Sequence, residues 1–139
     1  AGALTTNFFY SESDQLRDDP KEFEWIKKMS KEYLKTRPYF YEDFYPLTQV
    51  SDRSDIWSAA QYHRPERGDG IVQVFRRENS PYTDSCFNLS GINPEKTYVF
   101  SDADNGECFE ISGSELLQKG FNVHIEKKRC AKLYFYHVK

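Results

Sequence analysis

The stretch Phe121-Asn122-Val123-His124-Ile125-Glu126 decides the fold class of this 139-residue sequence. Apolar and polar residues alternate at every step, so a β-strand would place the apolar side chains on one face and the polar ones on the other. The same two-residue period recurs in short runs after residue 54, separated by Gly, Pro, Asn and Asp. We expect strands over residues 56–63, 71–77, 85–90, 97–101, 107–111, 121–126 and 131–138. This pattern predicts a mainly β protein, an antiparallel β-sandwich of about six to eight strands.

Two connections between these strands carry clear local signals. Asp104-Asn105-Gly106 is typical of a hairpin turn, because Asn-Gly accepts positive φ at both central positions. A calcium loop beginning at Asp102 would need Gly at its sixth position and Glu at its twelfth, and neither is there. Residues 112–120 contain Ser-Gly-Ser-Glu-Leu-Leu, which indicates one helical turn inserted between strands.

One long N-terminal α-helix is expected before the sandwich. Residues 19–22, Asp-Pro-Lys-Glu, combine a capping side chain, proline at the first helical position and a glutamate that reaches back. Pro38 forbids continuation, so the helix should cover residues 20–35. An aromatic connector over residues 39–46 follows. The apolar residues recur at steps of three and four and form one stripe, which comprises Phe23, Ile26, Met29, Tyr33 and Leu34.

Charge and hydropathy exclude two classes of partner. Nineteen basic and 22 acidic residues give a net charge of −3, and the pI is about 5.6, so the sequence lacks the basic surface that nucleic acid requires. No apolar run approaches the ~18 residues of a bilayer-spanning helix. We therefore expect neither a nucleic-acid partner nor a membrane span.

Cysteine and histidine spacing does not indicate a metal, a cofactor or a catalytic triad. Cys86, Cys108 and Cys130 form no Cys-x-x-Cys pair and are expected to be buried thiols. Their odd number, with no signal peptide visible, favours the cytoplasm. The three histidines fall on separate expected strands, none next to a nucleophile, and carboxylates such as Asp69 and Asp84 are expected to be solvated turn residues.

Exposed aromatic side chains are the candidate ligand contacts. Trp57, Tyr82 and Tyr41 could stack on the C–H face of a sugar ring, which gives carbohydrate as a candidate partner. The competing interpretation is that the aromatic connector fills the seam between the helix and the sheets. A second copy of the chain is a further candidate partner, because an uncovered helix stripe would favour dimerisation.

Three segments resemble the C-terminal end of bacterial α-galactosidases of glycoside hydrolase family 36. They are residues 37–48, RPYFYEDFYPLT; residues 57–77, WSAAQYHRPERGDGIVQVFRR; and residues 112–117 with 120–123, SGSELL and GFNV. The resemblance covers about residues 20–139. In that family a (β/α)₈ barrel carries the chemistry, and its last helix leads into a C-terminal antiparallel β-sandwich.

The resemblance implies a domain division and a role. Residues 1–50 would hold the last barrel helix and the connector, residues 4–10 being the remnant of the final barrel strand, and residues 51–139 would form the sandwich. The family's two catalytic aspartates lie upstream of this segment, so no catalytic residue is carried over. The implied function is a non-catalytic accessory domain that stabilises the catalytic barrel of its parent chain. The alternative is a stand-alone carbohydrate-binding module.

Overall fold

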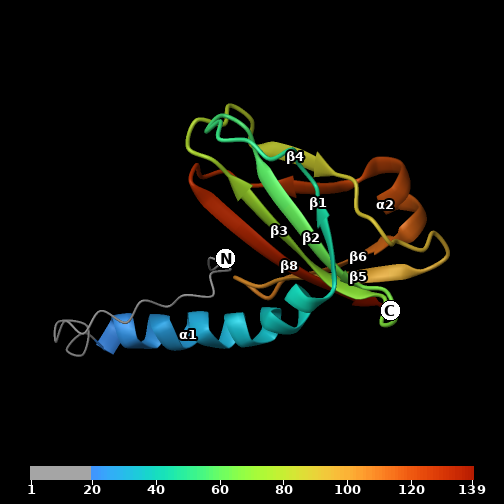
Figure 1. The fold of residues 1–139 in the computed structure, drawn as a ribbon, viewed down its shortest axis with the longest axis horizontal. Coiled ribbons are helices and arrows are strands. Elements are labelled where there is room, and N and C mark those ends of the chain that lie inside the picture. Colours follow the sequence, from blue (N-terminus) through green and yellow to red (C-terminus); the bar gives the residue numbers. More distant parts are fainter. Residues whose placement is uncertain (1–19) are drawn as a thin grey trace. The chain divides into compact units, whose positions relative to one another are not determined.

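The computed structural model describes residues 20–139 and shows one long helix followed by antiparallel strands (Figure 1). Helix α1 spans Pro20–Thr36, and a 3-10 helix spans Arg37–Tyr41. The helix predicted over residues 20–35 is therefore confirmed. The chain divides into two compact units between Pro38 and Tyr39. The expectations for residues 4–10 and for Asp19 lie outside the described residues.

Residues 39–139 form the β-sandwich that the sequence predicts. A six-stranded sheet has the order β1-β2-β3-β8-β5-β6, and β4 pairs with β7 in a second sheet (Figure 1). Every strand pair in residues 20–139 is antiparallel. All seven predicted strands are present, and β1, within the predicted connector, is an addition. The strands are β1 Asp43–Pro46, β2 Ser58–Arg64, β3 Asp69–Arg76, β4 Asp84–Phe87, β5 Thr97–Asp102, β6 Cys108–Ser112, β7 Phe121–His124 and β8 Cys130–Val138.

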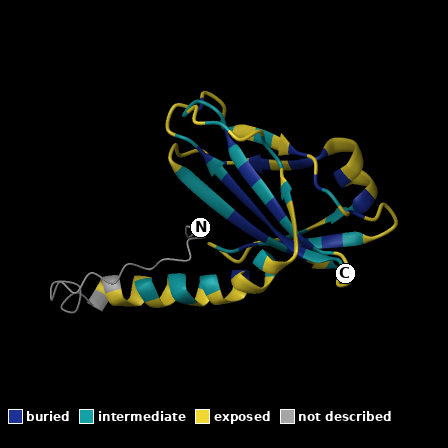
Figure 2. Cartoon of the chain, in the orientation of Figure 1, coloured by how far each residue is buried: buried dark blue, intermediate teal, exposed yellow. Residues whose placement is uncertain are grey.

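The core contains side chains from both sheets and from helix α2, Gly113–Lys119. Buried and half-buried residues alternate along β2 and β5, as the two-residue period requires (Figure 2). Phe100 lies in an aromatic stack, with ring centroids 4.6 Å from Phe121, 5.2 Å from Tyr136 and 5.7 Å from Phe109. Aromatic side chains thus fill much of the space between the two sheets.

Strands β4 and β7 are shorter than predicted because side chains replace the backbone ladder beyond their ends. The amide of Gln61 donates to the carbonyl of Ser90 and accepts from its N–H, both at 2.8 Å. The Arg76 guanidinium donates to the carbonyls of Ile125 and Glu126 at 2.8 and 2.5 Å. These bonds satisfy backbone groups that would otherwise extend the small sheet.

Both predicted connections are confirmed. Ser112 caps α2, because its hydroxyl accepts from the N–H of Glu115 at 3.2 Å, and Leu116 points into the core. The turn between β5 and β6 is closed by the N–H of Gly106, which donates to the carbonyl of Asp102 at 2.9 Å. Only Gly106 takes a positive φ there, at +73°, whereas the Asn-Gly pattern allowed two such positions.

The prediction of buried thiols is wrong. Cys86 and Cys108 are exposed and Cys130 is half-buried, all three as free thiols. Cys86 pairs across the small sheet with exposed Asn122, and Cys108 lies on the edge strand β6. No helix in the described part of the chain is long and apolar enough to cross a membrane.

A polar cluster of three side chains lies inside the sandwich. Tyr136 Oη is 2.8 Å from Nδ1 of His63 and accepts from Nε2 of Gln61 at 2.7 Å. His63 is 2 % exposed and Tyr136 is 1 % exposed. Burial is the main cause that lowers the pKa of His63, and it outweighs the opposing effects of a hydrogen bond to the backbone of Asp69 and of the Asp43 and Asp69 carboxylates.

We expect the free energy of unfolding to fall as the pH drops below 6.5, the ordinary pKa of histidine. Just below that pH, His63 binds a proton in the unfolded chain but not in the folded chain. Protonation therefore favours unfolding. The slope from this group is at most about 1.4 kcal/mol per pH unit. Urea titrations between pH 5 and pH 8 measure it.

Two variants assign this pH dependence. His63→Gln should remove the part of the slope that begins near pH 6.5, whatever its effect on absolute stability. His137→Gln, which replaces an exposed histidine, is the control for the substitution itself. An unchanged slope in His63→Gln would show that His63 accepts a proton as readily in the folded chain as in the unfolded one.

Candidate functional site

The outer face of the six-stranded sheet, turned away from the sandwich core, is apolar along its middle. Register places Phe44, Tyr62, Ile71 and Phe135 side by side on adjacent strands β1, β2, β3 and β8. Ile71 alternates with Val72, which points into the core, so Ile71 belongs to the opposite face. Leu133 lies on the same outer face, and both Ile71 and Leu133 are 0 % exposed. This sheet therefore buries apolar side chains on both faces.

The aromatic connector packs on this outer face. The Tyr62 ring lies 5.2 Å from the Phe40 ring and 5.1 Å from the Phe44 ring, measured between centroids. The Tyr39 ring lies 6.1 Å from the Phe135 ring. The connector thus packs on the sheet at β2 and β8.

A charged pair fixes the connector to the sheet. Arg64 and Asp69, at opposite ends of the β2–β3 turn, form a two-bond ion pair in which Nε of Arg64 is 2.7 Å from Oδ1 of Asp69. The same guanidinium donates to Oη of Tyr39 at 3.2 Å and lies 4.2 Å from the centre of its ring. Both charged side chains are 16 % exposed. The expectation that Asp69 is a solvated turn residue is therefore wrong, because Arg64 draws it onto the covered face.

Large apolar side chains remain exposed in α1 and the connector. Trp25 is 61 % exposed and Leu34 is 62 % exposed on α1, and Phe44 is 54 % exposed on β1. Beyond residue 50 the exposed large apolar residues of the described chain are Tyr82 and Leu117. Exposed large apolar side chains thus occur mainly in residues 23–50 of the described chain, on α1 and on the connector.

Sequence reasoning did not find the apolar outer face, although a signal for it exists. Ile71 and Val72 are consecutive apolar residues, and residues 133–136 read Leu-Tyr-Phe-Tyr. A strand with one wet face alternates, whereas a continuous apolar run is typical of a strand covered on both faces. Strands β3 and β8, the central pair of the sheet, carry that run.

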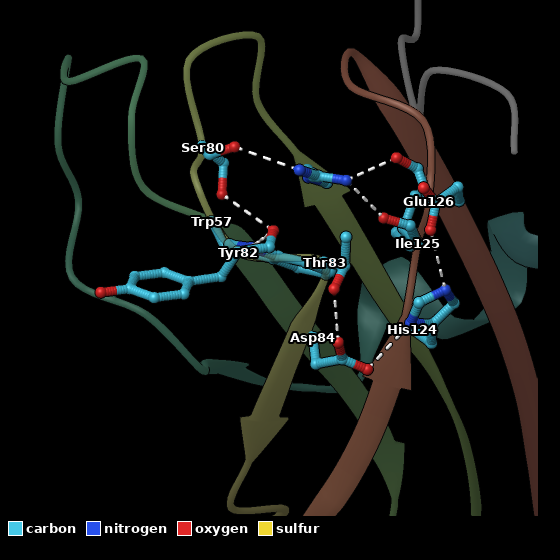
Figure 3. Close-up of polar contacts among 9 residues, drawn as sticks. Trp57, Ser80, Tyr82, Thr83, Asp84, His124, Ile125 and Glu126 are labelled. Carbon is cyan, nitrogen blue, oxygen red and sulfur yellow. Dashed lines mark hydrogen bonds and ion pairs between the residues drawn. The ribbon is translucent and has the colours of Figure 1, made fainter.

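The three candidate carbohydrate contacts lie in different surroundings. Trp57 is 7 % exposed, packs against Phe87 and donates from Nε1 to the carbonyl of Tyr82 at 3.3 Å (Figure 3). The expectation that Trp57 is exposed is therefore wrong, because its ring belongs to the core. Tyr82 is 72 % exposed and Tyr41 is 77 % exposed. Contact of these two tyrosines with carbohydrate stays a prediction.

An exposed polar cluster lies on the two-stranded sheet near Tyr82. His124 on β7 faces Asp84 on β4, with Nδ1 2.8 Å from Oδ1, and its Nε2 is 3.4 Å from Glu126 Oε2 (Figure 3). Hydrogen bonds from Thr83 and then His124 lower the pKa of Asp84. The Tyr82 ring points away from His124 (Figure 3).

All ionisable side chains of this cluster are more than half exposed. Residues 20–139 contain no group of three or more His, Cys, Asp or Glu side chains that could hold a metal ion. The prediction that His124 lies on the polar face of its strand is confirmed.

Comparisons with known proteins give matches in structure but not in sequence. No family model and no curated protein match the sequence. The α-galactosidase from Lactobacillus brevis matches at a TM-score of 0.65 and 19 % identity, over 89 % of this chain and 18 % of its own. A GH36 α-galactosidase from Geobacillus stearothermophilus matches at 0.66 and 18 % identity, over 87 % and 16 %.

The chain therefore spans less than a fifth of the length of either α-galactosidase. At these identities the likeness concerns the fold. The resemblance to the C-terminal region of family 36 α-galactosidases is confirmed at that level: this chain has the fold of a small part of such enzymes.

Proposed function

We propose that this chain is a non-catalytic accessory β-sandwich domain of an α-galactosidase-like glycoside hydrolase, and that it stabilises a catalytic (β/α)₈ barrel. The observation that carries the proposal is the exposure of large apolar side chains in α1 and, separately, in the connector. In this proposal residues 1–50 hold the last barrel helix and the connector, and residues 51–139 form the accessory domain.

The likeness in fold supports the proposal. The two matched chains are α-galactosidases, and this chain corresponds to under a fifth of each. A parent of similar size would have ample length for a barrel. The ionisable side chains of the exposed cluster around His124 are more than half exposed, which fits a supporting role. Catalysis then belongs to the parent chain.

The size of the expected effect follows from burial. Removing a large apolar side chain from water contributes about 1.5–3 kcal/mol. Trp25, Leu34 and Phe44 are each more than half exposed in this chain. A barrel that covered these three side chains would gain several kcal/mol from them.

The proposal predicts a loss of stability when the outer face is altered in the parent protein. The parent protein is identified by sequencing the coding DNA upstream of Ala1. Phe44→Lys should lower its melting temperature by about 5 °C or more, because a charge would replace an apolar contact in the interface. Deleting residues 39–139 should lower it further and reduce solubility. Differential scanning calorimetry and the soluble yield measure both effects.

Leu117→Lys is the matched control. Leu117 is 51 % exposed, close to the 54 % of Phe44, but it lies on α2 and not on the outer face. The melting temperature of the parent protein with Leu117→Lys should stay within about 1 °C of that of the unaltered parent, as for an ordinary surface change. Equal effects of the two substitutions, or an upstream frame without a barrel, would contradict the docking role.

A further inference from the structure

The turn between β5 and β6 contains Asn105-Gly106, the one Asn-Gly pair of the sequence. Both residues are exposed, and a Cβ built on Gly106 would meet nothing within 4 Å. Strand β6 lies at the edge of the six-stranded sheet, so this hairpin is held from one side only. The turn is therefore open to water, and it can loosen locally without unfolding of the sandwich.

The Asn105 side chain folds back over the peptide bond that follows it. Its Oδ1 accepts from the N–H of Glu107, two residues on, at 2.9 Å. This bond mimics a backbone turn and keeps Cγ of Asn105 close to the backbone nitrogen of Gly106. The Glu107 N–H would also stabilise negative charge on Oδ1, as a donor in an oxyanion hole does. The 2.9 Å bond from the Gly106 N–H to the Asp102 carbonyl opens before the nitrogen reacts, which needs only local loosening of the turn.

We propose that Asn105 is a site of self-modification, at which the folded chain deamidates spontaneously to aspartate and isoaspartate. The Gly106 N–H loses its proton to hydroxide, and the nitrogen lone pair attacks Cγ of Asn105. The Cγ–Nδ2 bond then breaks, and its electron pair leaves with the nitrogen, which takes a proton from water and departs as ammonia. Water hydrolyses the resulting cyclic imide. Breaking the new Cγ–N bond leaves aspartate, and breaking the backbone C–N bond leaves isoaspartate.

The one Asp-Gly pair of the sequence, Asp69-Gly70, shows how the fold prevents the same ring closure. Gly70 is buried in β3, which pairs with β2 on one side and with β8 on the other. The Asp69 carboxylate is held in its ion pair with Arg64, with Oδ1 2.7 Å from Nε. Neither the nitrogen nor the carboxyl carbon can therefore move toward the other. Of the two pairs, the fold leaves Asn105-Gly106 free to react.

Deamidation changes both the charge and the length of this turn. It adds a carboxylate beside the acidic residues Asp102, Asp104 and Glu107, in a chain whose net charge is already −3, and like charges repel. Isoaspartate also lengthens the backbone of the turn by one carbon. Strand β6 carries Phe109, whose ring lies 5.7 Å from the Phe100 ring, so a loosened hairpin weakens that packing. None of this depends on the accessory role, so either proposal can fail alone.

The test is incubation of the folded 139-residue chain at neutral pH, followed by trypsin digestion and mass spectrometry. Cleavage after Lys96 and Lys119 releases residues 97–119, in which Asn105 is the one asparagine. Exchange of ammonia for water raises the mass of this peptide by about 1 Da. The increase should be at least about ten-fold faster than in residues 78–96, whose three asparagines precede Ser, Leu and Pro, because only glycine leaves the attacking nitrogen unhindered. The peptide should yield two products, aspartate and isoaspartate, which chromatography separates.

Gly106→Ala is the decisive variant. It should slow the mass increase at least about five-fold, because the added methyl group hinders the approach of the nitrogen to Cγ. Alanine at a φ of +73° also loosens the turn, which alone would speed the reaction, so a slower rate reports access to the nitrogen. Asn105→Gln should abolish the increase, since a longer side chain closes a less favourable ring. No mass increase in the folded chain, an increase confined to the chain unfolded in urea, or an equal rate in Gly106→Ala would each overturn the proposal.

Discussion

Phe100→Ala is expected to lower the free energy of unfolding of the 139-residue chain by about 3–5 kcal/mol, the usual cost of truncating a buried phenylalanine. Phe100 is 0 % exposed, and its ring stacks on those of Phe109, Phe121 and Tyr136. Phe121 belongs to the small sheet and Tyr136 to the large one. The cavity would therefore open where the two sheets meet. Urea unfolding followed by far-UV circular dichroism measures the loss.

Phe44→Ala is the control for this prediction. Phe44 is 54 % exposed in the described chain, so its truncation removes little buried surface and should cost less than about 1 kcal/mol. A loss below about 1 kcal/mol for Phe100→Ala as well would show that the neighbouring rings collapse into the space. In the parent protein the difference in stability loss between Phe100→Ala and Phe44→Ala should be smaller, because the proposed docking surface would bury Phe44.

The sequence predicted the order of elements well because their signals are local. The start of α1, the cap of α2 at Ser112 and the turn at Gly106 each depend on a few adjacent residues. The alternation in residues 121–124 is likewise visible without knowing the partner strand. Local chemistry of this kind fixes where elements begin and end.

Side-chain surroundings were harder to predict because they depend on partners far away in the sequence. Trp57 is buried because Phe87 and the carbonyl of Tyr82 lie beside it, 30 and 25 residues away. Asp69 pairs with Arg64, five residues before it, but the same guanidinium also bonds Tyr39, which lies 25 residues before Arg64. A pattern of residue types does not distinguish a tryptophan on the surface from one in the core.

The outer face of the six-stranded sheet has the same origin. Four aromatic or aliphatic side chains from different strands become neighbours there only when β1, β2, β3 and β8 pair; they are Phe44, Tyr62, Ile71 and Phe135. Positive φ at Arg129 also has no signal in the sequence, since arginine is not a residue that favours it.

Gly70→Ala is expected to lower the free energy of unfolding by about 3 kcal/mol, at the upper end of the cost of overpacking. A Cβ at this position would come within 2.5 Å of Cζ of Tyr136 and would also clash with its hydroxyl and with the carbonyl of Tyr62. The carbonyl belongs to the backbone of β2, and the Tyr136 hydroxyl is held by Gln61 and His63. The methyl group therefore has no flexible neighbour to displace.

Gly106→Ala separates steric cost from conformational cost. A Cβ there would meet nothing within 4 Å, but φ is +73°, so alanine should cost only about 1 kcal/mol. Gly70 does not have positive φ, and its cost is purely steric. Adding Tyr136→Phe to Gly70→Ala should cost less than the two changes summed, because the hydroxyl clash is gone while the clashes with the ring Cζ and the Tyr62 carbonyl remain. Strict additivity in urea titrations would show that the tyrosine already moves away from the strand.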